Sequence, residues 1–440
     1  MRDSGKATLS RHISLHKRIP NMAQALRNAS PRDDQPEPRH MSIDQLLLFA
    51  ERLRPTLREH QQQCEARGFP SAEIFQALKD AGAFRILTPR RFGGFEMPLG
   101  DFYRMVIAIG RGCPSTGWWY ALGAGHALQV ASYFSETTQT ELFGASPDFS
   151  ASWSFNAKDT SIERVAGGYR VSGIWAYSSG VPHAPYFMGG LKPPAEWGLG
   201  DHGAGTWESP TIAFIIPSGT YVVYDDWSDT FGMRGSGSNS VCVDNVFVPE
   251  EFTLVMNRAA PIFGHTPGSR LHRNAMYAGL MNGVVEGGPA AAAVGAGLAA
   301  IDAYVDVISE SVAGQPLAEM PRHQRQLGLA LAKIDSAQGI TLQGAALYHA
   351  HAEKAMRSLS AFDHEKGLRI DGMYHTAETM VWEAMQLLIR GAGSRALREA
   401  SPLQRYFRDI TTLCSRRDQL DDRAVDIGAQ YLRKRGERSN

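Results

Sequence analysis

The sequence is poor in the features that mark several protein classes. Its four cysteines, Cys64, Cys113, Cys242 and Cys414, lie far apart without a paired spacing, so we expect no metal site and no disulfide framework. Basic and acidic residues balance at 45 each, which argues against binding to nucleic acid or to a membrane surface. No apolar run reaches the ~18 residues of a membrane span, and the nearest is residues 287–300. These absences favour a soluble, cytoplasmic protein.

Common catalytic signatures are also missing. The chain has no Walker-type phosphate loop, no zinc-protease helix, no serine-hydrolase elbow and no glycine fingerprint for a dinucleotide. His349 and His351 are two residues apart on a predicted helix, so they point to different faces and do not form a metal pair. The function must therefore be sought in less familiar patterns.

Residues 1–40 differ in composition from the rest of the chain. They carry eight Lys or Arg, four Asp or Glu and four prolines, with few large apolar side chains. Such a segment cannot bury enough surface to offset the entropy of ordering it. We predict a disordered tail, with Met41 as an alternative start.

Three parts follow the tail. Residues 41–148 show apolar side chains at three- and four-residue steps, which predicts an N-terminal helical domain with helices at 71–81, 99–110 and 115–134. Residues 149–260 change to short alternating runs between Gly and Pro turns, which predicts a central β-domain with strands at 169–173, 211–216 and 240–247.

Helical periodicity returns in residues 261–440, through 327–347, 376–388 and 408–432. These helices are long enough for an antiparallel bundle. Helices, then strands, then long helices indicate an α+β fold rather than alternating βαβ units.

Polar and aromatic residues concentrate in the predicted β-domain. They occur at residues 152–155, at residues 175–180 and at His183. A flat heteroaromatic cofactor needs apolar contacts for its ring and a few hydroxyl or backbone groups for its heteroatoms, and these segments supply both. The alternative is that the aromatics belong to the core and the serines to turns.

Several motifs resemble the acyl-CoA dehydrogenase superfamily. They are residues 78–94, residues 167–173, residues 231–238 with 246–249, and the pair Arg408–Asp409. They follow the family's order and cover about residues 43–432. The resemblance implies an N-terminal helical domain, a central β-barrel or sandwich and a C-terminal four-helix bundle.

Two classes within that superfamily compete. The slot of the dehydrogenases' catalytic glutamate holds Ala400, with Glu399 one step away. The flavin-dependent monooxygenases fit better, because their two-component hydroxylases resemble this chain at residues 113–115, His126, residues 175–180 and residues 402–405. An FAD-dependent dehydrogenase or oxidase is the alternative, and a flavin-free scaffold is a third reading.

The monooxygenase resemblance implies a complete reaction system. The chain would be the oxygenase component that hydroxylates a phenol-like or heteroaromatic small molecule through a flavin C4a-hydroperoxide. It would use reduced flavin (FMNH2 or FADH2), take molecular oxygen as co-substrate, and receive the flavin from a separate reductase. The resemblance also implies a homotetramer.

The same resemblance assigns the flavin contacts. Ser179 would face N5 of the flavin, and Tyr177 would replace a ring-packing tryptophan, with Ser178 between them. The remaining cofactor-binding residues would be those on the pyrimidine side of the ring and in the glycine turn, namely Ser152, Trp153, Ser154, Gly391 and Gly393.

Three further residues are expected at the reacting centre by resemblance. His126 would bind or polarise the phenolic oxygen of the substrate, and Arg273 (or Arg270) would hold the substrate or stabilise the peroxide. The related hydroxylases place a histidine about seven residues after the Arg-Asp aspartate, where this chain has Arg416. Arg416 keeps hydrogen-bond donors but cannot exchange a proton, because a guanidinium stays charged.

Overall fold

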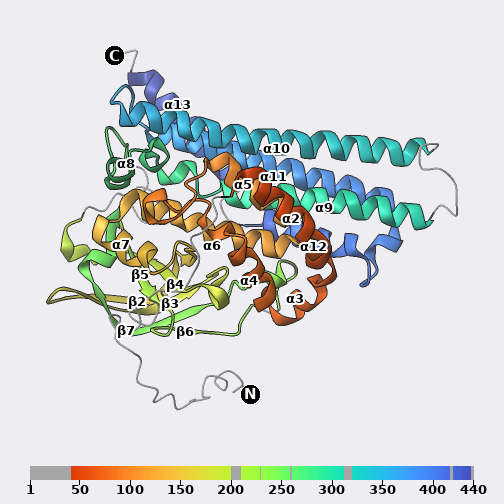
Figure 1. Cartoon of the computed structure of the whole chain (residues 1–440). Coiled ribbons are helices and arrows are strands. Elements are labelled where there is room, and N and C mark those ends of the chain that lie inside the picture. The colour runs from red at the N-terminus through yellow and green to blue at the C-terminus, as the bar shows by residue number, and fades with distance from the viewer. Residues whose placement is uncertain are drawn as a thin grey trace, which may run out of the picture.

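The computed structural model describes residues 41–199, 210–227, 229–257, 260–311, 320–416 and 420–437. The predicted tail of residues 1–40 lies outside these ranges. Within them, helices, a block of strands and a second set of helices follow one another along the chain (Figure 1). The predicted α+β order is therefore confirmed.

The first part is helical. Ser42 begins the first helix with a capping box, and Ser71 and Ser135 cap two later helices through their side chains. The two central helices are buried along most of their length. The helices of this part are α2 (Ile43–Glu59), α3 (Gln61–Arg67), α4 (Ala72–Asp80), α5 (Leu99–Gly112), α6 (Pro114–Tyr133) and α7 (Glu136–Ala145).

The strands form two four-stranded sheets, in the orders β1-β4-β5-β8 and β2-β3-β7-β6. Trp175 joins them, because its ring on β3 packs edge-on against Phe187 and Phe214 of the other sheet and its Nε1 donates to the Gly190 carbonyl. The arrangement is a sandwich. The strands are β1 (Ala151–Ser154), β2 (Asn156–Val165), β3 (Gly168–Ala176), β4 (Tyr186–Leu191), β5 (Thr211–Pro217), β6 (Val222–Val223), β7 (Val241–Pro249) and β8 (Thr253–Met256).

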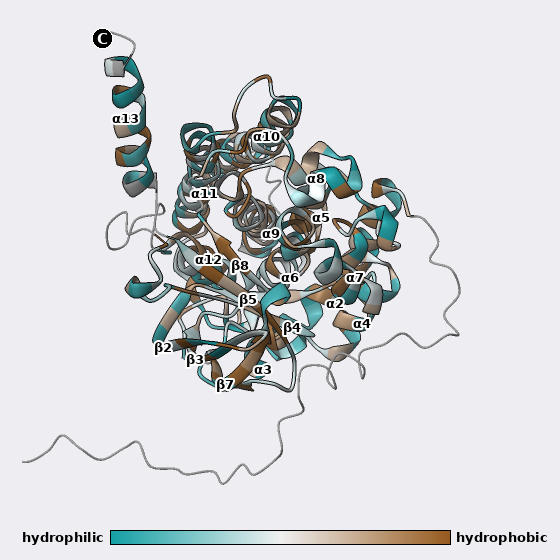
Figure 2. Ribbon diagram, turned by 90° about the vertical axis from the view of Figure 1, so that its left-hand side faces the viewer, coloured by the Kyte–Doolittle hydropathy of each residue, from teal (hydrophilic) through white to brown (hydrophobic). Residues whose placement is uncertain are grey.

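The last part begins with a short helix and continues as a bundle. Helices α9, α10, α11 and α12 pack against one another, and α13 lies on the outer side of α11 (Figure 2). The periodicity over residues 408–432 predicted one helix, but α12 ends at Cys414 and α13 begins at Leu420. The helices are α8 (Pro267–His272), α9 (Gly287–Ser311), α10 (Pro321–Met356), α11 (His364–Ala392), α12 (Pro402–Cys414) and α13 (Leu420–Glu437).

Helix α9 is long and apolar enough to cross a membrane by length and composition, but 72% of its apolar window is buried inside the protein. Its small residues allow close packing: a Cβ on Gly295 would lie 2.6 Å from the Ile107 carbonyl oxygen of α5. These features are those of a core helix of the bundle.

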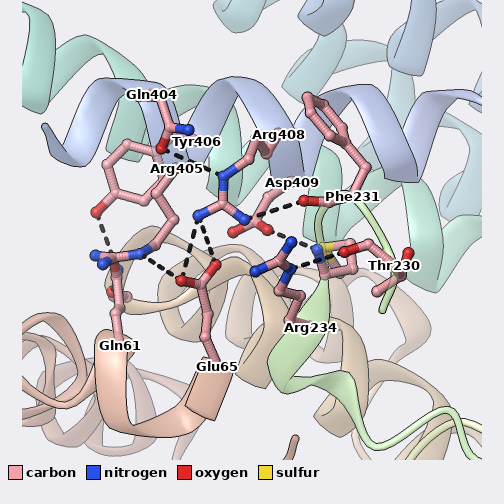
Figure 3. A network of polar contacts seen from close by, with 12 residues as sticks. Gln61, Glu65, Thr230, Phe231, Arg234, Gln404, Arg405, Tyr406, Arg408 and Asp409 are labelled. Carbon is pink, nitrogen blue, oxygen red and sulfur yellow. Dashed lines mark hydrogen bonds and ion pairs between the residues drawn. The ribbon is translucent and has the colours of Figure 1, made fainter. Parts of the chain in front are cut away.

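A polar network at α12 holds the three parts together (Figure 3). The guanidinium of Arg408 contacts both carboxylate oxygens of Glu65 on α3, at 2.9 and 3.2 Å, and donates to the Phe231 carbonyl. The Asp409 carboxylate accepts the backbone N–H of Met233 at 2.6 Å. Adjacent residues of α12 thus bind one helix of the first part and one loop of the β-domain.

The loop at residues 231–234 approaches α12 so closely that Gly232 has no room for a side chain. A Cβ there would lie 2.1 Å from the Arg408 carbonyl oxygen, which is backbone and cannot rotate away. The absence of a side chain at this position is therefore a requirement of the network.

We expect Gly232→Ala to lower the thermal unfolding midpoint. The added methyl group would push the loop off α12, and such overpacking costs about 1–3 kcal/mol. Gly144→Ala is the matched control, because a Cβ at Gly144 meets nothing within 4 Å. Equal unfolding midpoints for the two variants would show that the loop can move without cost.

Candidate functional site

One face of α6 carries three candidate site residues. Trp118, Leu122 and His126 follow at four-residue steps, which places their side chains in one row. All three are half-buried, whereas most other residues of this helix are fully buried. The row therefore borders open space at the junction of the β-domain and the C-terminal helices.

The Ser179 hydroxyl lies at one end of this row. It accepts a hydrogen bond from Trp118 Nε1 at 3.0 Å and lies 2.8 Å from the Ser238 hydroxyl, which in turn lies 2.7 Å from Ser236. Because a hydroxyl can accept two hydrogen bonds, Ser179 can accept from both neighbours and still donate its own proton.

The chain reaches this position through a tight turn. Gly180 has φ of +80°, and a Cβ there would lie 2.6 Å from Trp119 of α6. Its backbone N–H is shared by the carbonyl oxygens of Ser236 and Gly237, at 3.1 and 3.0 Å. The glycine thus lets the turn press Ser179 against α6.

Arg416 lies on the other side of Trp118. Its guanidinium carbon is 5.1 Å from the centre of the indole ring, a distance typical of a cation–π contact. Its Nη1 lies 2.6 Å from Glu286 and its Nη2 lies 2.5 Å from Glu378. Trp118 therefore connects two residues, Ser179 and Arg416, that are 237 positions apart in the sequence.

An apolar cavity of about 140 Å³ lies beside the other end of the row. Leu122 and His126 line it from α6, Trp153 from β1 and Val284 from the segment before α9. An engineered apolar cavity of ~150 Å³ holds a benzene molecule, so this volume suits a single aromatic ring.

The hydrogen bonding of His126 fixes the role of its ring. Nδ1 lies 2.8 Å from the Ala151 carbonyl oxygen, which can only accept, so Nδ1 carries a proton. Burial lowers the pKa of His126 to about 4, and the ring is therefore neutral at pH 7. Nε2 is left without a proton and is available as an acceptor for a hydroxyl group.

Strand β1 brings two unsatisfied polar atoms to this region. The buried Ser152 Oγ and Trp153 Nε1 have no hydrogen-bond partner among the described residues. Ser154 differs, because its hydroxyl donates to the Ala176 carbonyl at 2.5 Å and accepts from the Asn156 N–H. Unpaired buried donors and acceptors are costly, so the two free groups fit a bound heteroaromatic ring such as a flavin.

Of the two residues before Ser179, Tyr177 lies at the surface and Ser178 is buried. Tyr177 is 61% exposed, has φ of +58° and packs edge-on against Trp227. Its ring is open to a stacking partner. Ser178 is fully buried, and its hydroxyl donates to the Trp175 carbonyl, so Ser178 shapes the turn and offers no free hydroxyl to a cofactor.

The structure does not bring the remaining predicted residues to the cavity. Arg273 follows α8 with φ of +55° and is exposed, as is Arg270, and neither lines the cavity. Gly391 is buried against Tyr304 of α9, where a Cβ would lie 2.6 Å from the tyrosine hydroxyl, so packing between helices explains this glycine. Gly393 ends α11 with φ of +71° and has open space around it.

Four residues of this region were not predicted from the sequence. Trp118 could have been found, because it lies two helical turns before His126 on the same face. Glu286, His375 and Glu378 gave no such signal, because they join Arg416 only through the packing of separate helices.

Two larger hollows lie elsewhere, of about 850 Å³ beside α4 and β4 and about 1140 Å³ between α10, α11 and α13. Neither is lined by His126, whereas the smaller, apolar cavity is. We therefore place the candidate site at the smaller, apolar cavity and the adjoining row of α6.

Comparison with known proteins agrees with this geometry. Residues 44–143 match the acyl-CoA dehydrogenase N-terminal domain and residues 288–417 match the acyl-CoA dehydrogenase C-terminal domain. A pigment production hydroxylase of Rhodococcus sp. is 32% identical over 371 residues, which cover 82% of this chain and 88% of the relative. The oxygenase component of an FADH(2)-dependent resorcinol hydroxylase of Rhizobium sp. is 30% identical, covering 87% and 92%.

Among solved structures, 3-HSA hydroxylase from Rhodococcus sp. superposes with a TM-score of 0.76 at 27% identity, covering 88% of this chain and 96% of that chain. The resemblance predicted from the sequence motifs is confirmed. The chain belongs to the flavin-dependent monooxygenases of the acyl-CoA dehydrogenase fold, the family that contains the oxygenase components of two-component aromatic hydroxylases.

Proposed function

We propose that this chain is the oxygenase component of a two-component system that hydroxylates a phenol-like single-ring aromatic. The observation that carries the proposal is the apolar cavity of about 140 Å³, in which the neutral His126 offers an acceptor beside Trp153. Reduced flavin, when bound, supplies the electrons that activate molecular oxygen, and a separate reductase would deliver it.

The described residues would each contribute to one requirement of the reaction. His126 Nε2 would accept a hydrogen bond from the substrate hydroxyl, which orients the ring and makes it more electron-rich. The hydroxyl of Ser179 would donate to the flavin, and Ser152 and Trp153 would use their free polar atoms at its edge. The apolar lining would keep water from the reacting atoms, which suppresses side reactions.

The structure speaks against an acyl-CoA dehydrogenase. Ala400 occupies the glutamate slot, and the neighbouring Glu399 is exposed on the segment before α12 and does not line the cavity. The cavity is also too small for a fatty acyl chain. A substrate of one ring agrees with both observations.

The assembly would be a homotetramer. Gly391 and Gly393 lie thirteen or more residues beyond Glu378 on α11, which corresponds to ~20 Å along the helix. The predicted glycine turn therefore lies well along α11 from the residue that binds Arg416, and a neighbouring subunit would supply further cofactor contacts. Light scattering should give about four times the 48.2 kDa chain mass.

The reaction can be tested with isotopically labelled dioxygen. The chain, a flavin reductase, a nicotinamide reductant and a panel of simple phenols should yield a product with one labelled oxygen atom per ring. Omission of the reductase should abolish the product unless chemically reduced flavin is supplied. Turnover of an acyl thioester without oxygen incorporation would contradict the proposal.

We expect Ser179→Ala to raise the fraction of consumed oxygen that is released as hydrogen peroxide. Loss of one hydrogen bond of about 1 kcal/mol changes such a partition about fivefold. Product and peroxide are measured together under saturating substrate. Ser336→Ala removes an exposed hydroxyl of α10 and serves as control. Unchanged coupling in Ser179→Ala would refute the role of its hydroxyl.

We expect His126→Phe to weaken the binding of a phenol roughly tenfold, because the ring loses the acceptor for the substrate hydroxyl. The methyl ether of the same substrate has no proton to donate and should bind equally to both proteins. With a pKa of about 4, neutral His126 is present throughout the range above about pH 5, so binding should show no acidic loss near pH 6.5. Such a loss would show that the ring titrates normally.

A further inference from the structure

A cluster of buried ionisable groups lies behind Arg416. Its members come from the start of α9, from α11, from the segment after α12 and from α13, and they are Glu286, Asp371, His375, Glu378, Arg416 and Arg423. The side chains of His375 and Glu378 are 2% and 1% exposed. The monooxygenase reaction as described above uses none of the three α11 residues.

The contacts form a branched path. Arg416 binds Glu286 and Glu378, and the second carboxylate oxygen of Glu378 lies 3.4 Å from His375 Nδ1. On the far side, Arg423 Nε lies 3.2 Å from Asp371. The cluster therefore extends from the indole face of Trp118 into the interior of the bundle.

Among the described residues, the buried charges of this cluster do not cancel without an added proton. Three buried carboxylates face two guanidinium groups there, and both ring nitrogens of His375 and one oxygen of Asp371 have no hydrogen bond. A net charge in a buried site is costly, so one proton on His375 or Asp371 is favoured.

Titration of the two groups supports this reading. Burial, together with the nearby charge of Glu286, raises the pKa of Asp371 to about 7. Burial lowers the pKa of His375, but its contact with Glu378 and the charges of Glu286 and Asp371 outweigh that effect, so the pKa is raised overall.

The other groups around the cluster are hydroxyls and a thiol. Tyr103 of α5 packs edge-on against Tyr374, next to His375, and the Cys414 thiol approaches the Glu378 carbonyl. Burial raises the pKa of both tyrosines and of the thiol well above neutrality, so they stay uncharged near pH 7. On the exposed side, Asp426 lies 3.8 Å from Arg423.

The cluster adjoins the candidate site at two places. Val284 and Val285 line the cavity of His126, and Glu286, the next residue, binds Arg416. Arg416 in turn lies over Trp118, whose Nε1 binds Ser179. A change of charge in the cluster can therefore reach both the substrate cavity and the flavin-facing hydroxyl through direct contacts.

We propose that His375 is a positioning residue whose proton, shared with Asp371, balances the third carboxylate and so keeps Arg416 against Trp118. This inference rests on the proposed function. Loss of the proton leaves one excess negative charge, which draws the guanidinium toward the carboxylates and loosens the contact between Trp118 and Ser179.

Two substitutions should act in opposite directions. His375→Gln removes the site of the proton, so the peroxide fraction should be higher than in the parent protein at neutral pH. Asp371→Asn removes one carboxylate, balances the charges without a proton, and should keep the peroxide fraction low when the pH is raised to about 9. His349→Gln, an exposed change on α10, is the control.

In the parent protein the peroxide fraction should at least double as the pH rises from about 6 to about 9. A flat profile in the parent protein, or increased leakage in Asp371→Asn, would overturn the proposal. A purely structural role for the cluster predicts increased leakage in both variants at every pH.

The unliganded protein provides an independent measurement. Groups whose pKa is raised by folding stabilise the protein below their ordinary pKa, and this contribution is lost as the pH rises through the raised value. The thermal midpoint of the parent protein should therefore fall relative to that of Asp371→Asn between about pH 6 and pH 9. If the difference between the two thermal midpoints does not change across this range, the proposed proton on His375 and Asp371 is rejected, even if hydroxylation is observed. If no hydroxylated product forms, only the proposed function is rejected.

Discussion

The contacts of Arg408 and Asp409 are the constraint on which the arrangement of this protein depends. Arg408 binds Glu65 of the first helical part, and Asp409 accepts the Met233 N–H of the β-domain loop. The site is built where those same three parts meet, from α6, from the turn at Ser179 and from the segment after α12. A shift of α12 would therefore move Arg416 relative to Trp118 and Ser179.

The candidate site combines two environments that differ in polarity. Around His126 the lining is apolar, and burial holds the imidazole neutral. Around Arg416 the buried groups are charged, and each guanidinium lies beside a carboxylate. Trp118 lies between Arg416 and Ser179, since its ring meets the guanidinium and its N–H meets the Ser179 hydroxyl.

The sequence predicted what local patterns can encode. The order of helices and strands follows from periodicity and caps. The roles of His126 and Ser179 were assigned by resemblance, and the structure places the two residues on a helix and in a turn. Arg273 was assigned from its place in the chain, but the end of α8 turns it to solvent. The ionic cluster could not be predicted, because helix packing brings Glu286 and Arg416 together across 130 positions and no local pattern records that contact.

The row on α6 has a consequence for how such a scaffold can diversify. Leu122 stands midway between Trp118 and His126, ~6 Å along the axis from each, and its side chain lines the cavity. The helix fixes the spacing of Trp118 and His126. A smaller side chain at position 122 would therefore extend the cavity toward the Trp118 indole without moving either residue. A smaller residue at position 122 could thus admit a bulkier, fused-ring compound while Trp118 and His126 keep their places.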